Sequence, residues 1–191
     1  MNYNDELYPE DLLLLLKKAT EIAGDIKARL NDEKCPILNQ LFYQKNNKNY
    51  RDKKPFEKLG YVPNIDSKTG KPSSNNNEYK GLYVFGEEIN HKIIPVYIGI
   101  SRTVYRRLRQ HGFGKLDNQC SLAYLMAKHD NSKIERATIH EKYEKELTHK
   151  KEVVKSFKVA LYHIEKDYDL YFLEVALAAI LKTKWNSFRT H

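Results

Sequence analysis

Two short apolar segments, residues 81–85 and 93–98, lie close together near the middle of the chain and are separated by the mostly polar residues 87–92. Both segments are rich in β-branched and aromatic residues, which favour extended structure. The sequence therefore predicts a β-hairpin at this position. Residues 157–164 alternate between apolar and polar side chains, and this pattern predicts a third strand.

Helical periodicity precedes and follows the predicted hairpin. Residues 10–30 carry apolar side chains at helical spacing, with Asp11 near the start, and we expect a long amphipathic helix there. Pro36 opens a shorter helical stretch through Phe42. Between the hairpin and the third strand, three further helices are predicted at residues 103–111, 119–128 and 133–155, of which the last is highly charged.

The segment 44–80 is polar and rich in Asn, Lys, Gly and Pro, which is typical of loops. We therefore predict mostly loop there. With a length of 191 residues, the chain suits one domain, or one domain with a helical extension. The predicted division is an N-terminal helical extension and polar loop over residues 1–80, followed by a domain over residues 81–191.

The last predicted helix, residues 169–181, is nearly all apolar, and one side chain breaks its pattern. Glu174 lies on the same helical stripe as Leu170, Leu177 and Leu181. A carboxylate in such a place is costly unless something charged faces it.

The charge balance favours a polyanionic partner. Lysine and arginine number 33 against 25 acidic residues, which gives a formal net charge of +8. Part of this charge is local, because no acidic residue interrupts the stretch from residue 102 to His111. Candidate contacts to DNA phosphates are Arg102, Arg106, Arg109 and the nearby Lys115.

Two further features bear on location. No apolar run approaches the roughly 20 residues that a membrane span needs, so we expect no membrane partner. Cys35 and Cys120 match neither a zinc-site spacing nor a disulfide framework, which favours a reducing compartment. These features predict a cytoplasmic protein.

Phosphodiester cleavage needs an attacking oxygen, a group that takes its proton, positive charge beside the phosphate and a group that stabilises the leaving oxygen. Three features of the chain could supply them together: the hairpin tyrosines Tyr83 and Tyr97, Arg107 with His111 one helical turn later, and Glu174. A hard cation such as Mg²⁺ often takes only one or two protein carboxylates. One glutamate is therefore sufficient as the protein ligand of such a cation.

These residues carry a resemblance to a known family. Gly81-Leu82-Tyr83 followed by Tyr97-Ile98-Gly99 resembles the two tripeptides that name the GIY-YIG nuclease superfamily, with leucine in place of the usual isoleucine. The landmarks that follow in family order are Arg107, His111, Glu174 and Asn186. The resemblance covers residues 81–186. One departure is that Ile100 and Ser101 stand where some relatives carry a lysine.

The resemblance implies an α/β (α+β) fold with a small three-stranded antiparallel or mixed sheet flanked by helices. It implies that Tyr83 and Tyr97 face the scissile phosphate, and that Tyr83 handles the proton of the attacking water. Arg107 would clamp the phosphate, and His111 would contact phosphate or relay a proton. Glu174 would hold Mg²⁺ or Mn²⁺. Asn186 would bond to backbone or substrate and fix the local geometry.

Each of these residues also has an ordinary explanation when taken alone. A strand tyrosine is usually part of a core, and a charged helix residue is usually solvated. Glu174 could pair with a structural lysine, His111 could lie at a helix end facing the dipole, and Asn186 could cap a turn. The combination in family order is what favours a nuclease.

The expected function is therefore metal-dependent endonuclease cleavage of DNA, with double-stranded DNA as the partner. Helices in front of and between the motifs most resemble the restriction-type branch, which predicts a type II restriction-like enzyme. The alternatives are a structure-specific repair or mobile-element nuclease, and a nucleic-acid-binding module without turnover. A duplex cutter with one site per chain must dimerise or cut the strands in sequence. If it dimerises, we expect a homodimer on DNA, and the helix over residues 10–30 is one candidate contact between the two copies.

Overall fold

A three-stranded antiparallel sheet lies at the centre of the protein, in a computed structural model that describes residues 8–9, 11–60 and 79–186. Its strands are β3 (Gly81–Ile89), β4 (Lys92–Ser101) and β5 (Lys158–His163), in the order β4-β3-β5. The β3–β4 turn consists of Asn90 and His91, which both have positive φ angles of 52° and 61°, as a tight hairpin turn requires. The predicted hairpin and third strand are confirmed.

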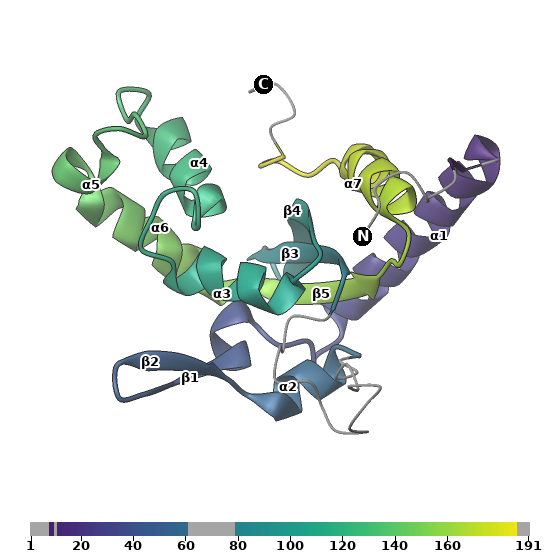
Figure 1. The fold of residues 1–191 in the computed structure, drawn as a ribbon, viewed down its shortest axis with the longest axis horizontal. Coiled ribbons are helices and arrows are strands. Elements are labelled where there is room, and N and C mark those ends of the chain that lie inside the picture. The colour runs from purple at the N-terminus through teal and green to yellow at the C-terminus, as the bar shows by residue number, and fades with distance from the viewer. Residues whose placement is uncertain (1–7, 10, 61–78, 187–191) are drawn as a thin grey trace.

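Helices cover both faces of the sheet, so the fold is α+β (Figure 1). Successive side chains of a strand point to opposite faces, and β3 shows this clearly. Tyr83 and Phe85 enter one apolar core, whereas Leu82 and Val84 enter the other. The first core lies against α3 (Val104–Phe113), α4 (Ser121–Asp130) and α6 (Glu144–Ser156), and the second lies against α1 (Leu12–Asn31) and α7 (Asp167–Leu181).

The N-terminal segment takes part in both cores. Helix α1 begins where the Asp11 carboxylate accepts a hydrogen bond from the backbone N–H of Leu14 at 2.9 Å, which is a standard N-terminal cap. The apolar stripe of α1 packs against α7 and the sheet. The short 3₁₀ helix η1 (Leu38–Leu41) supplies two leucines to the opposite core. Residues before the hairpin therefore help to form the same apolar interior as residues 79–186.

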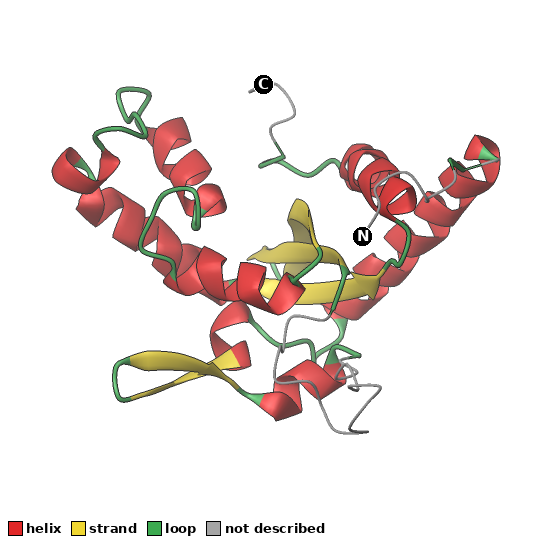
Figure 2. Ribbon diagram, viewed as in Figure 1, coloured by secondary structure: helices red, strands yellow, loops and turns green. Residues whose placement is uncertain are grey.

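One prediction about secondary structure is wrong, and a second does not hold in the part of its segment that the structure describes. The segment 133–155 does not form one helix, because it contains α5 (Ile139–Lys142) and α6 with turns before them (Figure 2). The break between α5 and α6 falls at Tyr143, whose φ of −130° and ψ of 26° are not helical. The predicted helices at residues 103–111, 119–128 and 169–181 are confirmed as α3, α4 and α7.

The segment 44–80 is not mostly loop in its described part. It contains β1 (Phe42–Lys45), β2 (Lys48–Arg51) and α2 (Lys53–Lys58), whereas residues 61–78 lie outside the described residues. Asn46 and Asn47 join β1 to β2 with φ angles of 50° and 56°. Asparagine tolerates this left-handed conformation better than most residues, which is why the pair forms a turn. None of the helices in the described ranges has the length and apolar character needed to cross a bilayer.

Candidate active site

The two hairpin tyrosines lie near each other on neighbouring strands. Tyr83 pairs across the hairpin with Gly99, and Phe85 pairs with Tyr97. The ring centroids of Tyr83 and Tyr97 are 6.2 Å apart. A Cβ atom on Gly99 would overlap the Tyr83 phenol, so the absent side chain makes the space in which this ring lies. The glycine of the second tripeptide is thus required by the position of the first tyrosine.

Tyr83 contacts His111 inside the protein. The Tyr83 hydroxyl oxygen lies 2.9 Å from Nε2 of His111, and the two side chains are 1% and 0% exposed. Burial raises the pKa of Tyr83 well above its usual range, with the neighbouring Tyr97 adding to the increase and Arg107 opposing it. Burial, together with the charge of Arg107, lowers the pKa of His111 well below its usual range. Both groups are therefore neutral in the folded protein near neutral pH.

His111 has one ring nitrogen without a partner. Its Nδ1 atom is buried and makes no hydrogen bond to any described residue. A buried polar atom without a partner is unusual and costs stability. The orientation of the ring is set instead by Nε2 and by edge contacts with surrounding aromatic rings.

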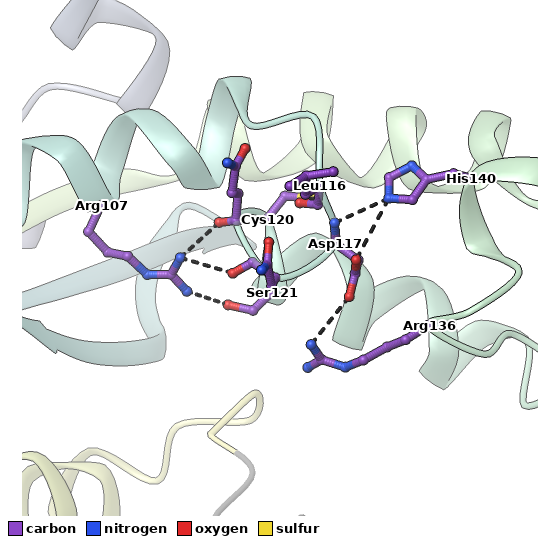
Figure 3. Close-up of polar contacts among 9 residues, drawn as sticks. Arg107, Leu116, Asp117, Cys120, Ser121, Arg136 and His140 are labelled. Carbon is purple, nitrogen blue, oxygen red and sulfur yellow. Dashed lines mark hydrogen bonds and ion pairs between the residues drawn. The ribbon is translucent and has the colours of Figure 1, made fainter.

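Arg107 connects α3 to the loop that precedes α4 (Figure 3). One terminal nitrogen donates to the carbonyl oxygens of Asn118 and Gln119 at 3.2 and 3.0 Å, and the other donates to the Ser121 hydroxyl oxygen at 2.6 Å. The guanidinium was expected to clamp phosphate, but here its fork faces this loop. Its charge still acts on the site, because it affects the pKa of Tyr83, Tyr97 and His111.

The same loop is held from its other side. The Asp117 carboxylate accepts a hydrogen bond from Arg136 at 3.3 Å, and its backbone N–H donates to Nε2 of His140 at 3.2 Å (Figure 3). The loop over residues 114–121, whose last residue is also the first of α4, is thus attached to α3 through Arg107 and to the α5 region through Asp117. Its last four residues, the 118–121 loop, contain the groups that Arg107 contacts. This double attachment positions Ser121 and the N-terminal end of α4 beside the tyrosines.

Glu174 is half-buried on α7, on the side of the helix that approaches β4. Burial raises the pKa of its carboxyl from 4.5 to about 7. Within the described residues this carboxylate makes no hydrogen bond and no ion pair. The described residues therefore do not supply the charged partner that a carboxylate in this position is expected to have.

Tyr97 is the residue at which these groups meet. Burial raises its pKa, while Arg107 and the Tyr83 hydroxyl oppose the increase. Glu174 raises the pKa further through its charge, although it belongs to a helix on the other face of the sheet. This approach is geometrically simple, because β4 is an edge strand. Tyr97 is also partly exposed, in contrast to the buried Tyr83 and His111.

Asn186 holds the chain against this edge strand. Its side-chain oxygen accepts a hydrogen bond from the backbone N–H of Ile98 at 2.9 Å, and its nitrogen donates to the carbonyl of Ile98 at 2.7 Å. The backbone N–H of Trp185 donates to the carbonyl of Val96 at 2.9 Å. The predicted backbone role of Asn186 is thus observed, and these bonds flank Tyr97 on both sides.

A metal would have a single protein carboxylate here. The described ranges contain no group of three or more His, Cys, Asp or Glu side chains that could hold an ion. A zinc-type cage is therefore not built from these residues. One half-buried carboxylate without a cation partner fits a hard cation that completes its shell with water and phosphate oxygens.

The predicted DNA-contacting residues fall in two places. Arg102 forms an ion pair with Asp167 at the start of α7, which also pairs with Lys80 at 2.6 Å. These contacts lower the pKa of Asp167 and connect the residues just before β3 and just after β4 to the start of α7. The remaining predicted residues, Arg106, Arg109 and Lys115, line a surface groove with the β1–β2 hairpin.

Two contributors to the site were not predicted from the sequence. Ser121 accepts the shortest hydrogen bond of Arg107 and lies near Tyr97, but an isolated serine carries no signal. The steric role of Gly99 depends on cross-strand register, which the tripeptide alone does not specify.

No protein-family model, curated protein or solved structure matches the chain.

Proposed function

We propose that the protein is a metal-dependent DNA endonuclease of the GIY-YIG type that acts as a type II restriction-like enzyme. The observation that carries this proposal is the gathering of Arg107, Glu174 and the Tyr83–His111 pair around Tyr97. A cation, a lone carboxylate and hydroxyl groups within one region are what phosphodiester hydrolysis requires. These residues are also the ones that stand in the order of the family motifs.

Tyr97 is the hydroxyl best placed to meet the substrate, because Tyr83 is buried behind it. In this assignment Tyr97 donates a hydrogen bond to a phosphate oxygen and Arg107 supplies the nearby positive charge. Arg107 reaches phosphate by exchanging one of its bonds to the 118–121 loop.

Tyr83 and His111 form a hydrogen-bonded pair behind Tyr97. In this assignment the Tyr83 hydroxyl donates to Nε2 of neutral His111 and its oxygen accepts a hydrogen bond from the attacking water, so Tyr83 orients the water while both side chains stay neutral. This arrangement suits a tyrosine whose pKa lies well above its usual range and a histidine whose pKa lies well below it. It differs from a free phenolate base, which burial disfavours.

Glu174 would hold the metal. A divalent ion such as Mg²⁺ or Mn²⁺ held by this carboxylate would supply positive charge beside the phosphate. A cation would also remove the electrostatic cost of the isolated carboxylate, because an opposite charge favours its ionised form. This complementarity supports a divalent ion as the missing partner of Glu174.

The test is digestion of a mixed-sequence plasmid by the wild type and by Tyr97→Phe, Tyr83→Phe and Glu174→Gln, with Mg²⁺ and with chelator. We expect discrete fragments from the wild type, dependent on metal, and a loss of at least about a hundredfold in rate for each variant. Tyr171→Phe is the matched control, since this tyrosine is 56% exposed on α7 and should cut normally.

The outcomes separate the proposal from its alternatives. Cleavage that survives Glu174→Gln would refute the assigned metal ligand. Cleavage of branched or nicked DNA but not of plain duplex would replace restriction by a structure-specific role. Binding to DNA without cleavage of any substrate would leave only a binding module.

Dimerisation belongs to the same proposal, because a duplex cutter with one site per chain needs a second copy to cut both strands at once. The first turns of α1 expose leucines that no described element covers. Their exposed fractions are 59% for Leu12, 80% for Leu13, 62% for Leu14 and 48% for Leu16. Exposed apolar clusters of this kind are typical of interfaces.

A further inference from the structure

The β1–β2 hairpin extends from the body of the protein as a two-stranded ribbon (Figure 1). Of its ten residues, 42–51, the six from Tyr43 to Lys48 are exposed and only Phe42 belongs to the apolar core. A separate two-stranded hairpin is marginally stable in water. Stacking of Tyr43 on Tyr50, with centroids 5.7 Å apart, supports the ribbon without fastening it to the fold. The core therefore gains little from this element.

The ribbon contains amide and cationic side chains but no carboxylates. Amide side chains occur at Gln44, Asn46, Asn47 and Asn49, and cationic ones occur at Lys45, Lys48 and Arg51. No carboxylate lies between Phe42 and Arg51. Amides and lysines are the groups that form paired hydrogen bonds with base edges, whereas carboxylates would repel the phosphates around them.

A cationic groove separates the ribbon from α3. It consists of two adjoining hollows of about 400 and 430 Å³, which share Asn49, Tyr50, Arg106 and Arg109 in their walls. Basic side chains in the two hollows come from both sides of the groove, with Lys48 and Arg51 on the ribbon and Arg106, Arg109 and Lys115 on or just after α3. Such a groove fits a chain of phosphates.

Helix α3 lies between this groove and the candidate active site. Arg106 and Arg109 face the groove, whereas Arg107 faces the 118–121 loop. Gln119 belongs to both regions, because it lines the groove and its backbone carbonyl accepts a hydrogen bond from Arg107. A nucleic-acid backbone in the groove would therefore run past the helix that carries the catalytic arginine.

We infer that the β1–β2 ribbon is the element that recognises DNA sequence, by entering the major groove while the α3 groove holds the adjacent phosphates. The major groove of B-form DNA is about 12 Å wide and admits a two-stranded ribbon, and amide side chains there pair with adenine. The major groove of double-stranded RNA is too narrow and deep for this contact. The inference rests on the proposed function for its substrate, duplex DNA, and adds the part of the chain that gives specificity.

The test uses Glu174→Gln as a non-cutting background and selects binders from a pool of DNA duplexes with a randomised centre. We expect a defined sequence motif to emerge. In the same background, Gln44→Ala with Asn46→Gly and Asn47→Gly removes three amides while preserving the turn, because glycine adopts positive φ readily. This variant should bind the pool with similar affinity but discriminate about tenfold less at each base pair that the three amides read in the parent protein.

The groove is tested separately through its charges. Arg106→Ala with Arg109→Ala should weaken binding to every sequence and reduce the slope of log affinity against log salt by about 1 for each phosphate that the variant leaves without a cation. The matched control is Lys17→Ala with Lys27→Ala, which removes two exposed cations from α1 and should leave both the slope and the motif unchanged. The side chains altered in addition to Glu174 are all exposed, so thermal unfolding of these variants should differ little from that of the Glu174→Gln protein.

The possible results are distinct. A motif that is unchanged in the amide variant, the absence of any motif, or equal binding to an RNA duplex would each overturn the inference. If the wild type cuts plasmid without sequence preference, the nuclease proposal stands and the ribbon inference fails. If a ribbon-dependent motif is found but nothing is cut, the inference stands and the nuclease proposal fails.

Discussion

Replacement of Glu174 by glutamine should stabilise the protein and abolish its proposed activity. Burial raises the pKa of this carboxyl from 4.5 to about 7, and the described residues provide no cation to offset the cost of its charge. The folded chain therefore binds the Glu174 proton more tightly than the unfolded chain does. Glutamine has nearly the same shape but never ionises, so it avoids this cost.

The magnitude follows from the shift in pKa. An increase from 4.5 to about 7 corresponds to about 3 kcal/mol, since each pKa unit is worth about 1.4 kcal/mol. The folded state holds more protons than the unfolded state between these two values, so the stability of the wild type should fall as the pH rises through this window. Above about pH 7 the loss is complete, and below about pH 4.5 it is absent.

Urea denaturation of both proteins at a series of pH values measures this difference. At about pH 8 we expect Glu174→Gln to be more stable by up to about 3 kcal/mol, equivalent to roughly 6–12 °C in thermal midpoint for a chain of this length. At about pH 4.5 the two proteins should unfold alike. Glu135→Gln, which alters an exposed glutamate, should show no such gain.

Metal provides the second arm of the same experiment. Mg²⁺ should stabilise the wild type at alkaline pH by mass action and should not stabilise Glu174→Gln. Equal stability of the wild type and Glu174→Gln at alkaline pH would refute the argument from burial. Equal stabilisation of both by Mg²⁺ would refute Glu174 as the metal ligand and would leave the argument from burial intact.

Three other changes test separate parts of the site. Gly99→Ala should displace the Tyr83 ring, abolish cutting and destabilise the fold by about 1–3 kcal/mol in urea melts. Its control is Gly24→Ala, which has free space around the added Cβ and should stabilise α1 by about 0.5–1 kcal/mol. Asn186→Ala removes two hydrogen bonds to β4 and should cost about 1–3 kcal/mol, with a fall in cutting that thermal shift and plasmid assays would record together. Leu13→Glu should convert a dimer to a monomer in analytical ultracentrifugation, and an unchanged mass would remove α1 from the interface.

The central sheet could be predicted because its signals are local. Strands β3 and β4 are apolar segments joined by a short polar turn, and α1 and α7 have long periodic patterns. The β1–β2 ribbon was missed because its residues are polar and its apolar content is almost limited to Phe42 and two tyrosines. The adjacent asparagines Asn46 and Asn47 were the available sequence signal for a turn. Asparagine tolerates the positive φ angles that both residues have in the structure.

For the candidate site, the sequence indicates which residues to consider but not how they are arranged. The motif order names the residues, but it does not specify that Tyr83 and His111 are buried or that Tyr97 reaches the surface. Burial depends on which residues of distant elements cover a side chain, and this is a tertiary property. The bonds of Arg107 to the 118–121 loop likewise depend on a loop conformation that no periodic pattern encodes.

Departures from the rules of stable folding occur in the regions assigned to function. Glu174 interrupts an apolar helix without a partner in the described residues, and His111 buries a ring nitrogen without a hydrogen bond. The ribbon exposes a polar hairpin that adds little to any core. A sequence selected for stability alone would remove all three, and proteins tolerate such conflicts mainly where function requires them. The proposed binding and cleavage of a polyanion would account for their occurrence beside a cationic groove and a pair of strand tyrosines.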